Sequence, residues 1–228
     1  METPTTPAKP TAPTDAGLSG ATFERTWLDE RSWVDVARGW LVDPSLVYQR
    51  VLDGVAWQQG RVFRYERWVD EPRLGATMPS GDALPHPAIA ETRRVLQHHY
   101  GVEFGRPGLA YYRDGRDLMA FHRDRDMRWL DDTVIALLVL GARRPFHLRP
   151  RANRYDHDAL HKGATHDVSP GEGDLVVMGG ACQVGWEHSV PPAPGVTGGR
   201  ISVQWRWTSR RGRPVVGASY RAPRTYSR

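Results

Sequence analysis

The chain has 228 residues, a formal net charge of +5 and a single cysteine, Cys182. One cysteine excludes an intrachain disulfide and gives secretion no support, and no apolar run reaches the length of about 18 residues that a membrane helix needs. We therefore expect a cytoplasmic monomer without a membrane partner, built as one compact domain with tails.

The positive charge fits a polyanionic partner such as nucleic acid, but it has a second explanation. Lys9 and Lys162 are the only lysines, so nearly all of the positive charge comes from arginine. Such a bias could equally reflect the base composition of the gene, and the charge alone leaves both explanations open.

The two ends of the chain have the composition of tails. Residues 1–22 are rich in Pro, Thr and Ala and almost free of apolar side chains, which predicts disorder. A folded domain is expected over residues 23–208. Residues 209–228 should form a mobile basic tail that either contacts phosphates or only improves solubility.

Helices are predicted in the first half of the chain. Asp43 followed by Pro44 is a favourable helix start, with Asp as the N-cap and Pro at the first helical position. A second helix is predicted from Pro87 to Tyr100, ahead of Gly101, which suits the left-handed cap conformation. Between them, residues 61–68 alternate aromatic and cationic side chains and predict a strand.

Short strands are predicted from residue 108 onward. Residues 108–113 and 117–122 are expected to form a hairpin around Asp114-Gly115. Further strands are predicted at residues 133–140, 144–149, 174–178, 183–188 and 199–207. Helices first and then many short strands favour an α+β chain whose core is a jelly roll or barrel.

A metal site is indicated by His122 and Asp124. Side chains two residues apart on a strand point to the same face, so an imidazole and a carboxylate would share one space there. Two His and one carboxylate are the usual ligands of a catalytic iron with open positions, and His188 is our candidate for the distant His. The pair alone is a weak signal, because His-x-Asp occurs by chance in many proteins.

The segment 200–206 is predicted to be a strand with one polar and one apolar face. The polar face carries Arg200, Ser202, Gln204 and Arg206. Two arginines facing one cavity would repel each other unless an anion lay between them, and a small dicarboxylate would satisfy both. From this segment alone, an ordinary amphipathic strand with its arginines in solvent is the favoured interpretation.

Taken together, these segments resemble the AlkB branch of the iron(II)/2-oxoglutarate dioxygenases, from about residue 73 to residue 207. The resemblance is most specific in four segments. Residues 109–115 are similar to the family's Asn-Arg-Tyr-x-x-Gly strand, and residues 122–126 are similar to its His-x-Asp-x-Asp/Glu segment. Residues 173–191 are similar to the strand pair with the distal His, and residues 200–206 are similar to its Arg-x-Asn-x-x-x-Arg strand.

The resemblance implies a double-stranded β-helix (jelly-roll) core flanked by N-terminal helices. It also implies Fe(2+), 2-oxoglutarate and O2 as cofactor and cosubstrates. The implied iron ligands are His122, Asp124 and His188. The residues implied to bind 2-oxoglutarate are Arg200, Arg206, Tyr112 and Ser202. No catalytic residue is implied beyond the iron ligands.

Two positions depart from the family pattern. Ala110 stands where the family has an Asn that assists 2-oxoglutarate binding, and Ser202 replaces a second Asn. Ser keeps a hydrogen-bonding group whereas Ala does not. We therefore expect weaker cosubstrate binding, or a compensating group such as Gln204.

Substrate contacts are implied at Asp126 and in a lid over residues 61–82. Asp126 corresponds to an acidic residue that reads the exocyclic amino group of the target base. A flipped base also needs a planar partner and a phosphate clamp. The candidates for these roles are Tyr65, Trp68, Arg73 and Met78. For Phe63 and Trp68, packing in the core is the alternative.

The implied activity is oxidative dealkylation of N-alkylated bases, namely 1-methyladenine, 3-methylcytosine or etheno adducts, in DNA before RNA. Such a protein would act in DNA repair. Two alternatives stay open. One is a 2-oxoglutarate dioxygenase that hydroxylates a protein or a small molecule. The other is a nucleic-acid-binding protein with a relic iron site, suggested by the loss of both Asn residues.

Overall fold

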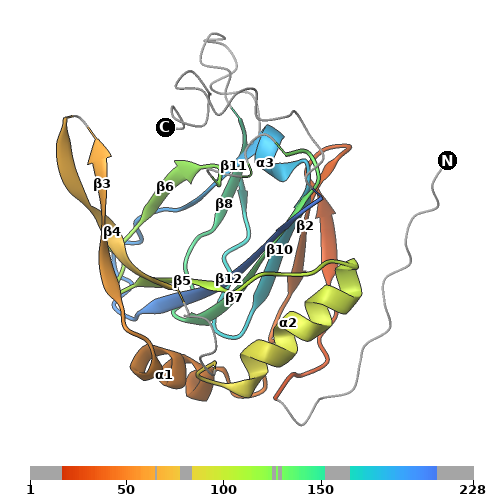
Figure 1. Cartoon of the computed structure of the whole chain (residues 1–228), viewed down its shortest axis with the longest axis horizontal. Coiled ribbons are helices and arrows are strands. Elements are labelled where there is room, and N and C mark those ends of the chain that lie inside the picture. Colours follow the sequence, from red (N-terminus) through yellow and green to blue (C-terminus); the bar gives the residue numbers. More distant parts are fainter. Residues whose placement is uncertain are drawn as a thin grey trace.

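Two antiparallel sheets make up most of the protein in the computed structural model, which describes residues 17–64, 66–77, 84–124, 127, 130–151 and 165–209 (Figure 1). The larger sheet has the strand order β1-β2-β10-β7-β12-β5-β4-β3. Its strands are β1 (Glu24–Trp27), β2 (Ser32–Ala37), β3 (Gln58–Arg64), β4 (Arg67–Thr77), β5 (Gly108–Tyr112), β7 (Thr133–Gly141), β10 (Leu175–Gly180) and β12 (Arg200–Thr208). The smaller sheet has the order β6-β11-β8-β9, with β6 (Met119–His122), β8 (His147–Pro150), β9 (His166–Asp167) and β11 (Trp186–Val190).

The two sheets enclose an inner core, and two helices cover the outer face of the larger sheet. The inner core joins both sheets, for example through Leu137 of β7 and Leu148 of β8. The outer core joins the larger sheet to the helices α1 (Pro44–Gly54) and α2 (Pro87–Tyr100), which lie along its lower side in Figure 1. This arrangement confirms the predicted jelly-roll class. Strands β1 and β2 precede α1, so the helices are not the first elements of the chain.

Both predicted helices are present, with the expected residues at their ends. The Oδ1 atom of Asp43 accepts a hydrogen bond from the backbone N–H of Leu46 at 3.2 Å, and Pro44 is the first helical residue of α1. Gly101 ends α2 with φ of 64°, a conformation that other residues adopt at a cost. Local sequence signals therefore determine where α1 begins and where α2 ends.

β12 has the predicted alternation of polar and apolar side chains. Ile201, Val203 and Trp205 are fully buried in the outer core against the helices. Because side chains alternate across a strand, Arg200 and Ser202 point to the other face, between the two sheets. Arg200 is 0 % exposed. The interpretation that the strand's arginines lie in solvent is therefore wrong for Arg200.

We predicted one strand over residues 61–68, but the chain reverses direction within this segment. The pairing of Arg64 with Arg67 closes a hairpin between β3 and β4, and Glu66 in the turn has φ of 61°. No Gly or Asn marks this turn, so nothing in the local sequence indicated it. The β3–β4 hairpin projects from the edge of the larger sheet (Figure 1).

The hairpin predicted from residues 108–113 and 117–122 is also wrong. β5 pairs with β4 and β12 in the larger sheet, whereas β6 pairs with β11 in the smaller one. The turn between them carries the chain from one sheet to the other. It is held by Arg144, whose guanidinium donates to the carbonyl oxygens of Asp114 and Asp117 at 2.8 and 2.7 Å. Such a long-range contact leaves no local signature in the sequence.

The predicted tails fall largely outside the described residues. Leu18, within the range 1–22 that we expected to be disordered, is 2 % exposed, pairs with Leu41 and belongs to the outer core. Residues 1–16 and 210–228 lie outside the described part of the chain. Among the described residues, no helix is long and apolar enough to span a membrane.

Candidate metal and cosubstrate site

His122, Asp124 and His188 come together at one end of the jelly roll. His122 ends β6, and its residue position pairs with His188 of β11, so the smaller sheet places the two rings 4.2 Å apart between centroids. The Oδ1 atom of Asp124 lies 3.7 Å from Nε2 of His122 and 3.8 Å from Nε2 of His188. One ligand atom from each residue lies within 4.8 Å of the others.

The protonation states of the three side chains suit a metal ion. Burial acts to raise the pKa of Asp124, but the charge of the neighbouring Arg206 opposes it and the pKa lies below its usual value, whereas burial lowers the pKa of His188 to about 3. Asp124 is therefore ionised and His188 neutral at pH 7, the forms that bind a metal. Nδ1 of His122 lies 2.9 Å from the carbonyl oxygen of Ala120 and must donate to it, which leaves Nε2 free as a ligand.

Arg206 orients the carboxylate of Asp124. Its Nε donates to Oδ2 of Asp124 at 2.5 Å, and its Nη2 donates to Oε1 of Gln204 at 2.7 Å. Oδ2 is thus occupied by the guanidinium, and Oδ1 faces the two imidazoles. The donor set of two imidazoles and one carboxylate fits a non-haem Fe(II) site with open positions.

Arg200 is the most unusual charged residue of the inner core. It is 0 % exposed, and all three of its guanidinium nitrogens lack a hydrogen-bond partner among the described residues. Burial lowers its pKa to about 10, so it still carries its charge at pH 7. A buried cation without a partner is costly unless an anion binds to it.

Tyr112 lies among three guanidinium groups. The centroid of its ring is 5.8 Å from Cζ of Arg200 and 5.4 Å from Cζ of Arg144, and the charge of Arg73 also acts on its hydroxyl. Burial raises the pKa of the Tyr112 hydroxyl, and these three charges oppose that increase only in part. The hydroxyl is therefore a neutral hydrogen-bond donor in a strongly positive environment, which favours a bound carboxylate.

The two positions that depart from the family pattern face each other. Ser202 of β12 pairs with Ala110 of β5, and both are buried. Gln204, which we expected to compensate for the lost Asn, instead contacts Arg206 at the Asp124 end of the strand. Its effect on cosubstrate binding therefore stays a prediction.

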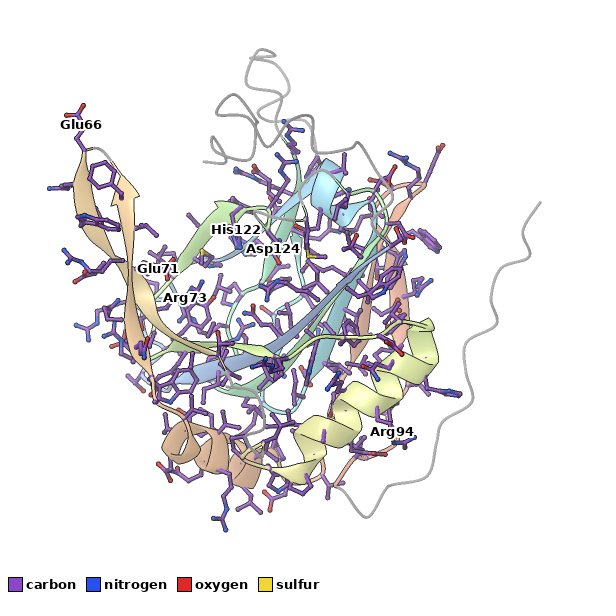
Figure 2. The ribbon with its side chains drawn as sticks, viewed as in Figure 1. Glu66, Glu71, Arg73, Arg94, His122 and Asp124 are labelled. Atoms are coloured by element: carbon purple, nitrogen blue, oxygen red, sulfur yellow. The ribbon has the colours of Figure 1, made fainter. Side chains whose placement is uncertain are left out.

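Only some of the residues predicted to bind substrate lie near this site. Arg73 of β4 is half-buried, and its Nε lacks a partner among the described residues. Figure 2 shows Arg73 and Glu71 on the part of β4 nearer the sheet, whereas Glu66 lies at the far tip of the hairpin. Trp68 packs edge-on against Phe63 near that tip and is 60 % exposed, so it does not pack in the core. Three further candidates lie outside the described residues: Tyr65, Met78 and Asp126.

Sequence reasoning missed two residues of this region. Arg144 is fully buried beside Tyr112, and Gln183 contacts the backbone of Asp124. We had placed Gln183 in a strand, but it lies in the single helical turn α3 (Cys182–Gly185). Neither residue belongs to a local pattern that could have revealed it.

Comparison with known proteins agrees with this geometry. The model of the 2OG-Fe(II) oxygenase superfamily matches residues 77–206. Alpha-ketoglutarate-dependent dioxygenase alkB homolog 3 of Rattus norvegicus is 25% identical over 162 residues, which cover 66% of this chain and 55% of the relative. DNA oxidative demethylase ALKBH2 of Homo sapiens is 28% identical over 160 residues, covering 64% of this chain and 60% of the relative. The chain thus spans little more than half the length of these relatives.

Solved structures show the same fold. A prolyl hydroxylase from Trichoplax adhaerens, in complex with a peptide fragment of hypoxia inducible factor, superposes with a TM-score of 0.54 at 15% identity, over 77% of this chain and 83% of that one. The epimerase SnoN from nogalamycin biosynthesis gives a TM-score of 0.53 at 12% identity, over 76% of each chain. Fe(2+), 2-oxoglutarate and O2 are the cofactor and cosubstrates that the family implies. The chain belongs to the 2OG-Fe(II) oxygenase superfamily, and its relatives support the AlkB family that its motifs resemble.

Proposed function

We propose that this protein is an iron(II)- and 2-oxoglutarate-dependent dioxygenase that removes N-alkyl groups from bases of nucleic acid, with DNA as the preferred substrate. Family membership supports the oxygenase chemistry, and the names of the AlkB relatives support a nucleic-acid substrate. The observation that carries the proposal is the buried guanidinium of Arg200, which has no partner in the same core that holds the His122–Asp124–His188 group.

Each group of residues has a separate task in this proposal. His122, Asp124 and His188 would hold the iron, and Arg200 with the Tyr112 hydroxyl would hold a carboxylate of 2-oxoglutarate. The roles of Arg206 and Ser202 at the cosubstrate are part of the same proposal. Arg206 also keeps Oδ2 of Asp124 occupied, so that Oδ1 remains for the metal.

The bound iron and 2-oxoglutarate would supply the oxidising chemistry, in which O2 converts 2-oxoglutarate to succinate and carbon dioxide and places a hydroxyl on an N-alkyl carbon. The hydroxylated alkyl group then leaves as an aldehyde, which restores the base. The protein's own contribution is to hold the cosubstrate beside the metal and to present the alkyl carbon.

The substrates we propose are 1-methyladenine, 3-methylcytosine and etheno adducts. Methylation at a Watson–Crick nitrogen makes the ring cationic, and a carboxylate at Asp126 would favour such a ring over the uncharged base. Arg73, beside Tyr112, has a buried nitrogen without a partner among the described residues and is suited to a phosphate of the flipped nucleotide. Trp68 would contact neighbouring nucleotides, since it lies near the tip of the hairpin.

One assay tests the activity and the substrate together. The protein is reconstituted with Fe(II) without oxygen and then given air, 2-oxoglutarate and an oligonucleotide with 1-methyladenine, and succinate and the mass of the base are both followed. We expect succinate and unmodified adenine in equal amounts. Succinate without repair of the base would refute the nucleic-acid substrate and favour hydroxylation of a protein or small molecule. No succinate, with nucleic acid still bound, would favour a relic iron site.

A pair of histidine variants checks the iron assignment. His122→Ala should abolish turnover and metal binding but keep the fold, because the side chain of His122 is partly exposed at the end of β6. His147→Ala is the matched control, since His147 lies in the same sheet with a side chain that is 28% exposed against 31% for His122. Full activity of His122→Ala would refute the assignment.

A further inference from the structure

The segment that carries Asp124 has left the regular hydrogen bonding of the smaller sheet. β6 ends at His122, and the backbone N–H of Asp124 donates to a side chain, Oε1 of Gln183, at 2.8 Å. Gln183 is 59 residues further along the chain and is 1 % exposed. A buried amide that accepts a backbone N–H takes the place of the missing strand partner.

The helical turn α3 holds Gln183 firmly. The N–H groups of Val184 and Gly185 both donate to the carbonyl oxygen of Ala181, at 2.9 and 3.0 Å. The Nη1 atom of Arg123 donates to the carbonyl oxygens of Gln183 and Val184, at 3.3 and 3.5 Å. The segment of Arg123 and Asp124 and the turn α3 are therefore joined by two contacts from the Arg123 side chain and one from the Gln183 side chain.

Asp124 is consequently fixed at three points. Its N–H is bound by Gln183, its carbonyl oxygen accepts from the N–H of Met127 at 3.0 Å, and its Oδ2 accepts from Arg206 at 2.5 Å. The one carboxylate oxygen outside these bonds is Oδ1, which faces both imidazoles. A side chain held in this way cannot turn away from the metal position without breaking its hydrogen bond to Arg206.

The same helical turn is continuous with the strand that carries His188. α3 ends at Gly185, and β11 begins at Trp186, two residues before His188. Gln183 therefore connects the backbone of Asp124 to the element that carries the distal His. The pairing of β6 with β11 brings His122 opposite His188 but ends there, so the position of Asp124, two residues further on, depends on this connection and on the bond to Arg206.

We propose that Gln183 is a positioning residue, which sets the separation of Asp124 and His188 and thereby the affinity for the metal. The inference rests on the proposed function, in which these residues hold iron. Gln183 touches neither metal nor substrate, and it acts through the Asp124 backbone. Partners of this kind affect metal affinity by about 10- to 100-fold when they are removed.

The test measures Mn²⁺ affinity of the full chain, because Mn²⁺ binds similar oxygen and nitrogen ligands without oxidation chemistry. Gln183→Met has a similar length but no acceptor, and Gln183→Asn keeps an amide that ends one carbon short. We expect both to weaken Mn²⁺ binding by ~10- to 100-fold. Gln183→Glu keeps an oxygen acceptor at the same distance and should weaken Mn²⁺ binding by less than ~10-fold, below that range. Val184→Ala controls for disturbance of α3.

Two further measurements separate positioning from folding. Thermal unfolding of the metal-free proteins shows whether a variant is folded, and 2-oxoglutarate should still bind at saturating Mn²⁺, because Arg200, which would hold one of its carboxylates, lies on another sheet. If the Met and Asn variants are folded and bind Mn²⁺ as the original protein does, the inference is overturned. An equal loss in the Glu variant also overturns it. Failure of the unaltered protein to bind Mn²⁺ would instead overturn the proposed function itself.

Discussion

Arg200 would bind a ligand, but its burial should lower the stability of the unliganded protein. A guanidinium that is 0 % exposed and has no partner among the described residues costs free energy in the unliganded protein. We predict that Arg200→Met raises the free energy of unfolding of the unliganded protein by about 1–4 kcal/mol, the range seen when buried ion pairs are replaced by apolar side chains of similar volume. Urea denaturation without metal or cosubstrate measures this change.

The same variant should lose its response to cosubstrate. 2-Oxoglutarate with Mn²⁺ should raise the melting temperature of the original protein, since a ligand stabilises the state that binds it. The melting temperature of Arg200→Met should not change when 2-oxoglutarate is added. Arg206→Met is the control for the predicted gain in stability. Its guanidinium is paired with Asp124, so its removal should destabilise the protein rather than stabilise it. A less stable Arg200→Met protein would show that Arg200 has a structural partner.

Arg200 and Gln183 differ in how much of their position could be predicted from the sequence. Arg200 belongs to a strand whose alternation is visible in the sequence, so the face it shares with Ser202 could be predicted, but its inward direction was implied only by the resemblance to the family's Arg-x-Asn-x-x-x-Arg strand. Gln183 acts through a hydrogen bond to a residue 59 positions away, in a turn without periodicity. The candidate ligands were predictable through their motif, whereas the residue that we propose positions them was not.

At the scale of elements, Asp174 fastens the start of β10 to the end of β2. It is 3 % exposed and accepts hydrogen bonds from the side chain of Arg38 at 2.7 Å and from the N–H groups of Gly39 and Gly171 at 2.9 and 2.8 Å. Asp174→Ala should lower the free energy of unfolding by about 3 kcal/mol, the lower end of the cost of breaking a buried pair, because Arg38 is half exposed. Arg94→Ala, which breaks the exposed pair with Glu91, should leave it nearly unchanged, because solvent screens such a pair.

The effect of Asp174 should depend on pH in a defined direction. Burial alone would raise the pKa of Asp174, but the donors from Gly171, Arg38 and Gly39 outweigh it and lower the pKa below its usual value. The carboxylate therefore stabilises the folded state above the unfolded pKa of about 3.9, and this contribution is lost as the pH falls through the lower folded value. Urea denaturation at pH 7 and near pH 3 should show the difference between the original protein and Asp174→Ala shrinking with acidity. A constant difference would contradict this account.

The β3–β4 hairpin is an element with exposed aromatic side chains that burial does not explain. Phe63 and Trp68 are 61 % and 60 % exposed and pack against each other with ring centroids 5.5 Å apart. Stacking of a base on an aromatic side chain contributes about 1–3 kcal/mol. We predict that Trp68→Ala weakens binding of single-stranded DNA by ~10-fold, which corresponds to an energy within that range.

A second exposed tryptophan provides the control for this prediction. Trp27 is 58 % exposed on β1, at the opposite edge of the larger sheet from β3. Trp27→Ala should leave DNA affinity unchanged in fluorescence anisotropy, and both variants should convert 2-oxoglutarate without DNA at the original rate. Equal losses in the two variants would mean that the hairpin has no special part in binding.

At the scale of the whole molecule, the two main helices and most strands after residue 108 were predictable, but the pairing of strands was not. β7 was recognisable by its continuous apolar run, which reflects burial on both faces, and β12 by its alternation of polar and apolar residues. β5 and β6 are close in sequence, yet they belong to different sheets, because β6 pairs with β11 to bring His122 opposite His188. The topology is determined by these long-range pairs, which local patterns do not contain.

The distribution of charge over the whole chain leads to the last prediction. Residues 210–228 carry six arginines and no acidic residue, so removing them changes the formal net charge from +5 to −1. Each phosphate contact contributes a slope of about 0.7 to the dependence of single-strand affinity on salt, on logarithmic scales. A chain that ends at residue 209 should therefore bind single-stranded DNA more weakly and with a flatter salt dependence, while its turnover of 2-oxoglutarate without DNA stays the same. Replacing the six arginines by lysine should preserve both affinity and slope, because the charge is retained. An unchanged slope after truncation would show that the tail contributes only to solubility.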